Sequence, residues 1–225
     1  MIVRLIVQTF VSYGVMGLLL FWAAGTLDWP DAWIYLTLMI VVSLVGGLWL
    51  VRRDPGLVRE RLAAAIQKDQ PLADKLVLST FLVLFLAWQA LIALDAVRYR
   101  WSFVPPWAQA IGAFVLLVSL WIGFRTLRAN SFAAPVVKIQ SERGQTVIST
   151  GPYAYVRHPL YAGALGFMVG ASLLLGSLWG LAGVLVLTVL LAVRIQIEER
   201  TLRAGLTGYD DYARRVRYRL IPGLW

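Results

Sequence analysis

Long apolar runs, separated by short polar segments, make up most of the chain. Four of them, at residues 5–27, 32–51, 76–97 and 106–127, contain at most one charged residue each. A helix needs about 20 apolar residues to cross a hydrocarbon core of roughly 30 Å. Each of these runs is therefore predicted to form one membrane-spanning helix.

A fifth apolar run, residues 160–193, contains no charged residue. As a single helix it would be about 51 Å long, which is too long for one crossing. Gly176-Ser177 near its middle favours a chain reversal, so we predict a tight hairpin of two short helices that need not span the bilayer fully. The pattern as a whole predicts an all-α polytopic membrane protein with about six membrane helices.

The chain becomes polar after Glu199, yet apolar and aromatic side chains still recur at near-helical spacing. They lie opposite a set of arginines, and they are Leu202, Leu206, Tyr209, Tyr212 and Val216. This spacing predicts an amphipathic helix. Two placements remain open, on the inner leaflet of the membrane or packed on the cytoplasmic loops.

Composition supports a membrane protein and explains the positive charge. The 225 residues are 60% hydrophobic, with a mean hydropathy of +0.72 and a net charge of +9. If the N-terminus lies inside, all but Arg98 and Arg100 of the 21 Lys and Arg residues fall in inner segments, as the positive-inside rule requires. We therefore expect a multi-pass protein with both termini in the cytoplasm, a lipid bilayer as its partner and no nucleic acid.

The residue inventory excludes several kinds of chemistry. The sequence has no cysteine, so it has no disulfides and no thiolate nucleophile. His158 is the single histidine, which removes zinc and haem sites that need two histidines from one chain. We expect no metal site.

The polar stretch at residues 128–161 is longer than a simple connector needs, and long loops are often functional. Gly151-Pro152 favours a turn, and Pro159 suits the first turn of the next helix. Tyr153, Arg157, His158 and Tyr161 are thereby predicted to surround a helix N-terminus, where an anion such as a carboxylate is favoured. The alternative interpretation is a belt of side chains that anchors the helix at lipid headgroups.

A second candidate cluster, at residues 194–199, follows the hairpin. Arg194 and Glu198 are four residues apart and share a helix face. Two adjacent glutamates, Glu198 and Glu199, oppose the dipole of a helix that ends there. Either the helix continues beyond them, or they bind a positive group such as a sulfonium or an ammonium.

Residues 125–225 carry several motifs in a fixed order. A polar loop is followed by G-P-Y-x-Y-x-R-H-P-x-Y-x-G at 151–163, the apolar hairpin, R-x-x-x-E-E at 194–199, Y-D-D-Y at 209–212 and L-I-P at 220–222. This order resembles the isoprenylcysteine carboxyl methyltransferase family, and phospholipid methyltransferases look similar. The resemblance divides the chain into N-terminal transmembrane helices at 1–104, for scaffold and substrate access, and a methyltransferase core at 105–225.

The resemblance implies a membrane enzyme that binds S-adenosylmethionine without a Rossmann fold. It places the reaction at Arg194 and Glu198, with Arg194 also meeting the substrate, and it leaves the role of Lys138 open. The cofactor residues implied by it are Gln145, Thr146, Val147, Ile148, Tyr153, Arg157, His158, Pro159, Leu160, Tyr161, Glu198 and Glu199. The implied acceptor is a hydrophobic small molecule, lipid-like or prenylated, with a carboxylate favoured as the methylated group and the active site on the cytoplasmic side.

Two other functions fit parts of the pattern. Membrane sterol reductases, which use NADPH, look similar around an R-H-x-x-Y corner. A non-enzymatic membrane module is the third possibility, although the spanning runs contain few ionisable residues that would mark a transport path. The sequence leaves the oligomeric state open.

Overall fold

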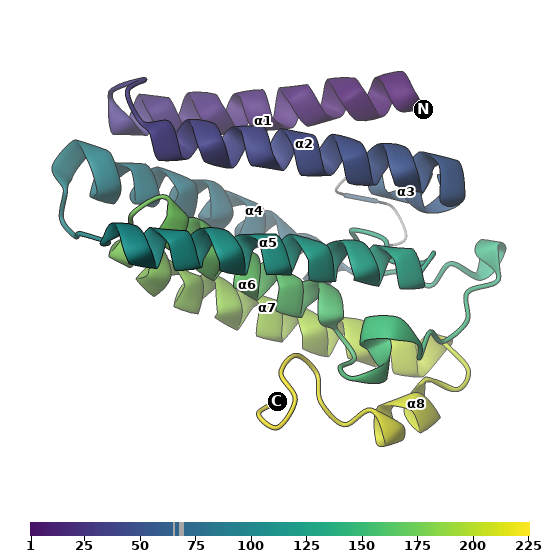
Figure 1. Ribbon diagram of the computed structural model, residues 1–225. Helices are drawn as coiled ribbons and strands as arrows, with labels where there is room; N and C mark the ends of the chain where they lie inside the picture. Colours follow the sequence, from purple (N-terminus) through teal and green to yellow (C-terminus); the bar gives the residue numbers. More distant parts are fainter. Residues whose placement is uncertain (65, 68–69) are drawn as a thin grey trace.

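The computed structural model describes residues 1–64, 66–67 and 70–225, and within these ranges it contains helices and no strand (Figure 1). The long helices are α1 (Ile2–Ala24), α2 (Pro30–Arg53), α4 (Leu72–Ala93), α5 (Pro106–Ala129), α6 (Pro159–Leu174) and α7 (Leu178–Gly205). The short ones are α3 (Pro55–Arg61) and α8 (Tyr209–Arg215). A π-helical turn, Leu94–Tyr99, continues α4, and 3₁₀ turns lie at Ser141–Arg143 and Gly151–Ala154.

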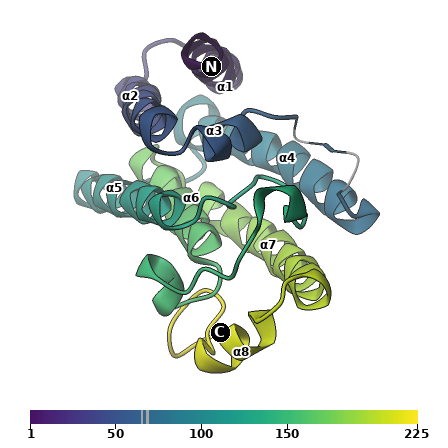
Figure 2. The same cartoon turned by 90° about the vertical axis from the view of Figure 1, so that its right-hand side faces the viewer.

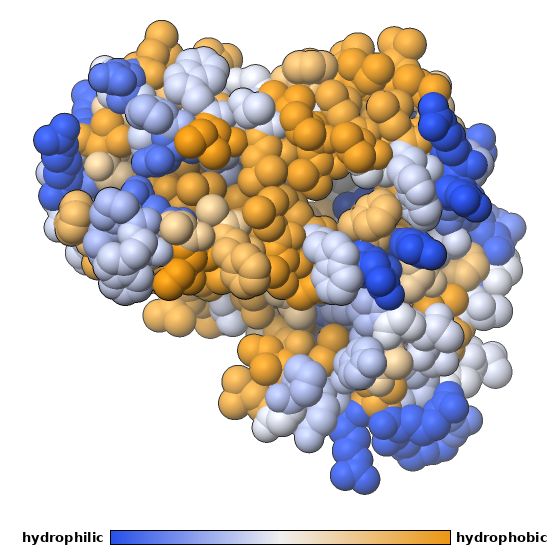
Figure 3. All heavy atoms as spheres, viewed as in Figure 1, coloured by the Kyte–Doolittle hydropathy of each residue, from blue (hydrophilic) through white to orange (hydrophobic). Residues whose placement is uncertain are grey.

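Among the described residues, five helical segments are long and apolar enough to cross a membrane, namely α1, α2, α4 with its π-helical end, α5 and α7. The shorter apolar helix α6 has 16 residues. The predicted all-α, polytopic class and the four predicted spanning runs are confirmed. Large apolar side chains such as Leu18, Trp22 and Leu185 are more than two-thirds exposed, which suits a lipid environment. Figure 3 shows hydrophobic residues over the middle of the visible face and hydrophilic ones toward its ends.

The predicted reversal at Gly176-Ser177 is confirmed. Gly176 adopts a left-handed conformation with φ of 85°, and the Ser177 hydroxyl accepts a hydrogen bond from Gly180 N at the start of α7. The prediction of two short helices is wrong for the second arm. Helix α7 has 28 residues and continues through both glutamates, because its inner face stays buried at Leu191, Ile195 and Glu199.

The predicted single amphipathic helix after Glu199 is also wrong. Helix α7 already covers its first part and ends at Gly205, and Gly208, with φ of 85°, breaks the chain before the seven-residue α8. Tyr209 and Tyr212 of α8 are 4% and 2% exposed. This face therefore packs on the protein, as in the second of the two placements that the sequence left open.

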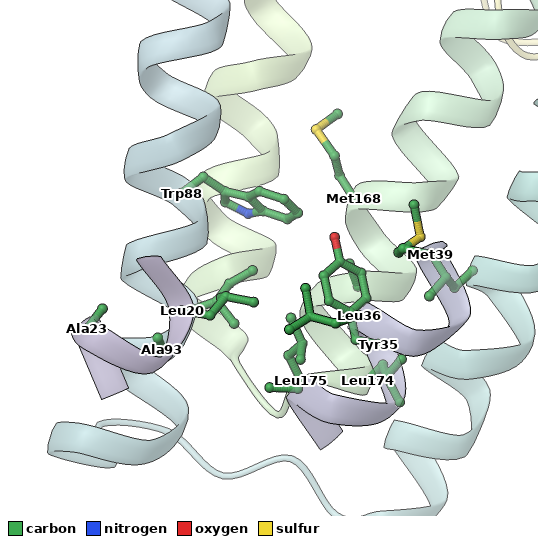
Figure 4. Packing of buried hydrophobic residues seen from close by; sticks show 14 of the residues in the cluster. Leu20, Ala23, Tyr35, Leu36, Met39, Trp88, Ala93, Met168, Leu174 and Leu175 are labelled. Carbon is green, nitrogen blue, oxygen red and sulfur yellow. The ribbon is translucent and has the colours of Figure 1, made fainter. Parts of the chain in front are cut away.

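One apolar core joins all six long helices. Figure 4 shows Leu20, Tyr35 and Met168 reaching into it from α1, α2 and α6. The tightest helix contact lies between α5 and α6, where a Cβ on Gly112 would come within 2.6 Å of the Leu174 backbone nitrogen. Only a residue without a side chain permits this approach.

Helix α3 and the non-helical segment between α5 and α6 lie at the same end of the bundle as the N-terminus and α8 (Figures 1 and 2). A hydrogen bond from Arg4 Nη2 to the Leu62 carbonyl, at 2.7 Å, joins the N-terminus to the residues after α3. The polar stretch at 128–161 and the exit of α7 thus meet at this end.

Candidate functional site

A cavity lies at this end of the bundle, between the polar loop after α5, the first turn of α6, the C-terminal part of α7 and α8. Its walls mix polar and apolar side chains from segments that are up to 82 residues apart in the sequence. The lining residues are Asn130, Phe132, Ala133, Ala134, Val136, Val137, Lys138, Gln145, Thr146, Val147, Ile148, Tyr153, Arg157, His158, Leu160, Tyr161, Glu198, Thr201, Leu202, Leu206, Tyr209 and Tyr212.

The corner before α6 has the turn that its sequence predicts. Gly151 takes a left-handed φ of 61°, and Pro159 occupies the first turn of α6. The backbone N–H groups of Arg157 and His158 each donate at 2.9 Å to carbonyls of Tyr218 and Arg219. The C-terminal tail therefore holds the corner in place.

Glu199 is the buried carboxylate that connects the corner, α7 and the tail. Its Oε1 accepts from Arg157 Nε at 2.7 Å and lies 3.3 Å from His158 Nε2, and its Oε2 accepts from Arg219 Nε at 3.1 Å. Arg157 Nη1 donates in addition to the carbonyls of Val216 and Arg217. These bonds occupy Glu199, which does not line the cavity.

Glu198 has a different environment from its neighbour. Its Oε2 accepts from the Tyr161 hydroxyl at 2.7 Å, and His158 Nδ1 lies 3.8 Å from the same oxygen. Its side chain is 28% exposed and lines the cavity. Within the part of the chain that the structure describes, its Oε1 makes no hydrogen bond, so the carboxylate can accept from a ligand.

Two tyrosines add polar groups to the walls of the cavity. The Tyr209 hydroxyl is buried and has no hydrogen-bond partner among the described residues, and burial raises its pKa. Burial likewise raises the pKa of Tyr153 to about 12, although a hydrogen bond from Asn130 Nδ2 at 2.9 Å opposes the shift. Both phenols are therefore neutral near pH 7 and can donate a hydrogen bond into the cavity.

Arg194 lies one turn before Glu198 on α7 and is not among the lining residues. Its Nε donates to Asp74 Oδ1 at 2.9 Å, its Nη2 donates to the Pro135 carbonyl at 2.5 Å, and its guanidinium lies 5.7 Å from the centre of the Tyr161 ring. Lys138 lines the cavity and forms an ion pair with Glu60 Oε2 at 2.6 Å.

The structure brings most of the candidate site residues together. Ten line the cavity, namely Gln145, Thr146, Val147, Ile148, Tyr153, Arg157, His158, Leu160, Tyr161 and Glu198. Pro159, Arg194 and Glu199 lie beside it, not in its lining. Sequence reasoning did not find Asn130, Thr201, Tyr209 or Tyr212 as lining residues, nor Asp74 behind Arg194. The signal for Asp74 was a single acid in the first turn of an apolar helix.

Comparison with known protein families identifies the segment that contains this cavity. Residues 107–206 match the phospholipid methyltransferase family, which is part of the isoprenylcysteine carboxyl methyltransferase-like group. The match runs from α5 through α7 and includes most of the cavity lining. No curated protein matches the chain. The resemblance seen in the sequence is confirmed, and the domain supports a membrane methyltransferase that acts on lipid-like molecules.

Proposed function

We propose that this chain, whose residues 107–206 match the phospholipid methyltransferase family, transfers a methyl group from S-adenosylmethionine to a lipid-like acceptor at the cytoplasmic face of the membrane. The observation that carries the proposal is the cavity in which the polar corner before α6 meets the exit of α7. Glu198 from α7 and Tyr161 from α6 share a hydrogen bond there, so both ends of the hairpin can contact one small molecule.

The cavity has the chemical groups that S-adenosylmethionine requires. Glu198 has a free carboxylate oxygen for an ammonium or for ribose hydroxyls, and the unpartnered Tyr209 hydroxyl can bond a further polar atom. Val147, Ile148 and Leu202 offer apolar surface for the adenine ring. A buried hydroxyl without a partner is costly in a folded protein, and a polar ligand would satisfy it.

The negative charge of Glu198 also suits the positive charge of a sulfonium. A carboxylate in a partly buried cavity attracts a cation more strongly than one in water. The Tyr161 hydroxyl fixes the orientation of this carboxylate through its 2.7 Å hydrogen bond. We propose that the cofactor pocket is completed by Gln145, Thr146, Val147, Ile148, Tyr153, Arg157, His158, Leu160 and Tyr161, with Pro159 and Glu199 holding the corner behind them.

The proposed reaction requires little chemistry from the protein beyond orientation. S-adenosylmethionine supplies a methyl group that its sulfonium already activates for displacement. The side chains hold the two reactants in line and exclude water, which accounts for most of the rate in such reactions. Arg194 would orient an anionic group of the acceptor. A carboxylate acceptor has no proton to lose, whereas an amine acceptor would pass its proton to Glu198 or His158.

Two observations favour the methyltransferase over an NADPH-dependent reductase. One is the family match across α5 to α7. The other is the carboxylate of Glu198 in the cavity wall, which would repel the phosphates of NADPH. Heating the purified protein with each cofactor separates the two functions, since the cofactor that binds the folded state raises the unfolding temperature.

Methyl transfer itself is tested with the purified protein in lipid vesicles. Methyl-labelled S-adenosylmethionine is added to vesicles made from a total lipid extract, and the labelled product is identified by mass spectrometry. We expect label in one apolar compound, and at least about tenfold slower labelling with the Glu198→Gln variant when S-adenosylmethionine is kept below its dissociation constant. Unlabelled lipid with a folded wild-type protein would refute the proposed function.

A further inference from the structure

Asp74 is a fully buried carboxylate in the first turn of α4, outside the segment that matches the methyltransferase family. Its Oδ2 accepts from Gln70 Nε2 at 2.6 Å and from the backbone N–H of Val137 at 3.0 Å. Its Oδ1 accepts from Arg194 Nε at 2.9 Å. One carboxylate thus joins α4, the cavity loop and α7.

Arg194 is the side chain that this carboxylate constrains most. Asp74 binds its Nε and the Pro135 carbonyl binds its Nη2, which fixes the plane of a group that is only 11% exposed. Its Nη1 has no hydrogen bond to any of the residues that the structure describes. Its N–H groups are therefore available to donate to an anionic ligand, for which a planar guanidinium is well suited.

The position of Arg194 along α7 suits an acceptor that arrives from the bilayer. It lies one helical turn before Glu198, between the apolar part of α7 and the cavity. Its guanidinium lies over the ring of Tyr161, whose hydroxyl donates to Glu198. A continuous series of contacts therefore runs from Asp74 through Arg194 and Tyr161 to the carboxylate in the cavity.

We infer that Asp74 is a positioning residue for methyl transfer, which holds Arg194 so that its Nη1 meets the anionic group of the acceptor. The inference rests on the proposed function and extends it to the N-terminal helices. Besides serving as a scaffold, these helices then contribute the negative charge of Asp74 to the end of the bundle that contains the cavity. Without that charge Arg194 loses a compensating partner in a buried place, and its guanidinium no longer keeps one orientation.

The test compares Asp74→Asn, Arg194→Gln and the double variant. Rates of methyl transfer are measured with increasing concentrations of vesicles made from total lipid extract, and affinity for S-adenosylmethionine is measured separately. We expect Asp74→Asn to lower kcat/KM for the extract at least about tenfold, as misplacement of an orienting group does. Its affinity for S-adenosylmethionine should stay within about threefold of wild type, because no step of the inference involves the cofactor.

The double variant separates positioning from a general loss of stability. If Asp74 acts through Arg194, adding Asp74→Asn to Arg194→Gln should lower kcat/KM by less than about twofold, because residues that act as a unit are not additive. Independent, additive losses would overturn the inference. A wild-type protein that labels no lipid would refute the proposed function instead, so the two failures are distinguishable.

Asp95 provides a matched control on the same apolar segment. It is also fully buried and accepts three hydrogen bonds, from Ser102 Oγ at 2.7 Å, Ser177 Oγ at 2.6 Å and Trp179 N at 3.1 Å. Ser177 and Trp179 lie at the hairpin turn and Ser102 lies in the loop before α5, both at the far end of the bundle (Figure 1). Asp95→Asn should lower the unfolding temperature but change kcat/KM less than about twofold. An equal loss of kcat/KM in both variants would contradict a positioning role.

Discussion

At the scale of single residues, Glu199 stabilises the site by binding Arg157, His158 and Arg219 at once. Glu199→Gln removes a charge that compensates Arg157, which is 7% exposed. Breaking a buried ion pair in this way costs about 3–5 kcal/mol. We expect a clear fall in the unfolding temperature of the detergent-solubilised protein.

The exposed pair Asp211–Arg214 is the control for that variant. Both side chains are more than 60% exposed, so Asp211→Asn should leave the unfolding temperature nearly unchanged. If the two variants melted alike, Glu199 would not be the connecting residue described above.

The two tyrosines of α8 are expected to differ in role, one stabilising the fold and the other binding the cofactor. The Tyr212 hydroxyl donates to the Tyr153 carbonyl at 2.9 Å, whereas the Tyr209 hydroxyl has no partner among the described residues. Tyr212→Phe should therefore destabilise the protein by about 1 kcal/mol. Tyr209→Phe should not destabilise it, but should weaken binding of S-adenosylmethionine several-fold, by about 1 kcal/mol.

The stability of both variants is measured by thermal unfolding, and their affinity for S-adenosylmethionine is measured by calorimetric titration. A Tyr209→Phe protein that melts earlier but binds S-adenosylmethionine normally would mean that the hydroxyl serves the fold and not a ligand.

Some site residues could be found from the sequence because they are close together in it. Tyr153, His158 and Tyr161 belong to one motif, and Glu198 follows at a fixed place after the hairpin. Asp74 could not be found in this way, because its partners Val137 and Arg194 are 60 or more residues away in the sequence. Tyr209 could not be found either, because it follows the break at Gly208 that separates α8 from α7. Helical periodicity gives the face of a residue but not its distant partner.

At the scale of helices, the contact between α5 and α6 places the corner beside the cavity. A Cβ on Gly170 of α6 would lie 2.6 Å from the Leu116 nitrogen and 2.8 Å from the Gly112 carbonyl oxygen of α5. Gly170→Ala must therefore separate the two backbones, and overpacking of this kind costs about 1–3 kcal/mol. We expect a lower unfolding temperature and weaker binding of S-adenosylmethionine.

Gly123 on α5 is the matched control, because a Cβ there would meet no atom of the described residues within 4 Å. Gly123→Ala should keep the stability of the wild type or exceed it, since alanine favours helix. Similar losses in both variants would point to glycine itself, not to the close approach of the helices.

The apolar pattern predicted which segments are helices better than where they end. The runs at 5–27, 32–51, 76–97 and 106–127 each correspond to a helical segment that is long and apolar enough to span a membrane, and the turn at Gly176-Ser177 lies where the pattern placed it. The end of α7 did not follow hydropathy, because buried ion pairs at Glu199 allow a charged turn to stay helical. The last helix is short because Gly208 separates it from α7, and hydrophobic periodicity does not show such a break.

At the scale of the whole molecule, we propose that the site end of the bundle faces the cytoplasm, as the distribution of Lys and Arg indicates. The chain has no cysteine, so single cysteines can report sidedness directly. Glu142 lies between α5 and α6, in the segment at the site end, and Asp28 lies in the loop between α1 and α2 at the other end (Figure 1), and both are exposed. A membrane-impermeant thiol reagent outside intact cells should label Asp28→Cys and leave Glu142→Cys unlabelled. The reverse pattern would invert the topology.

We propose that one cavity, formed where the corner before α6 meets the exit of α7, binds S-adenosylmethionine through Glu198. Isothermal titration calorimetry of the purified protein tests it most directly, with Glu198→Gln beside Glu142→Gln, an exposed carboxylate outside the cavity lining. We predict binding on the order of 1–100 μM for wild type and Glu142→Gln. Glu198→Gln should bind at least about tenfold more weakly while unfolding at the same temperature, because a hydrogen bond to a charged group is worth about 1.5–3 kcal/mol. Equal affinity in all three proteins would contradict the claim.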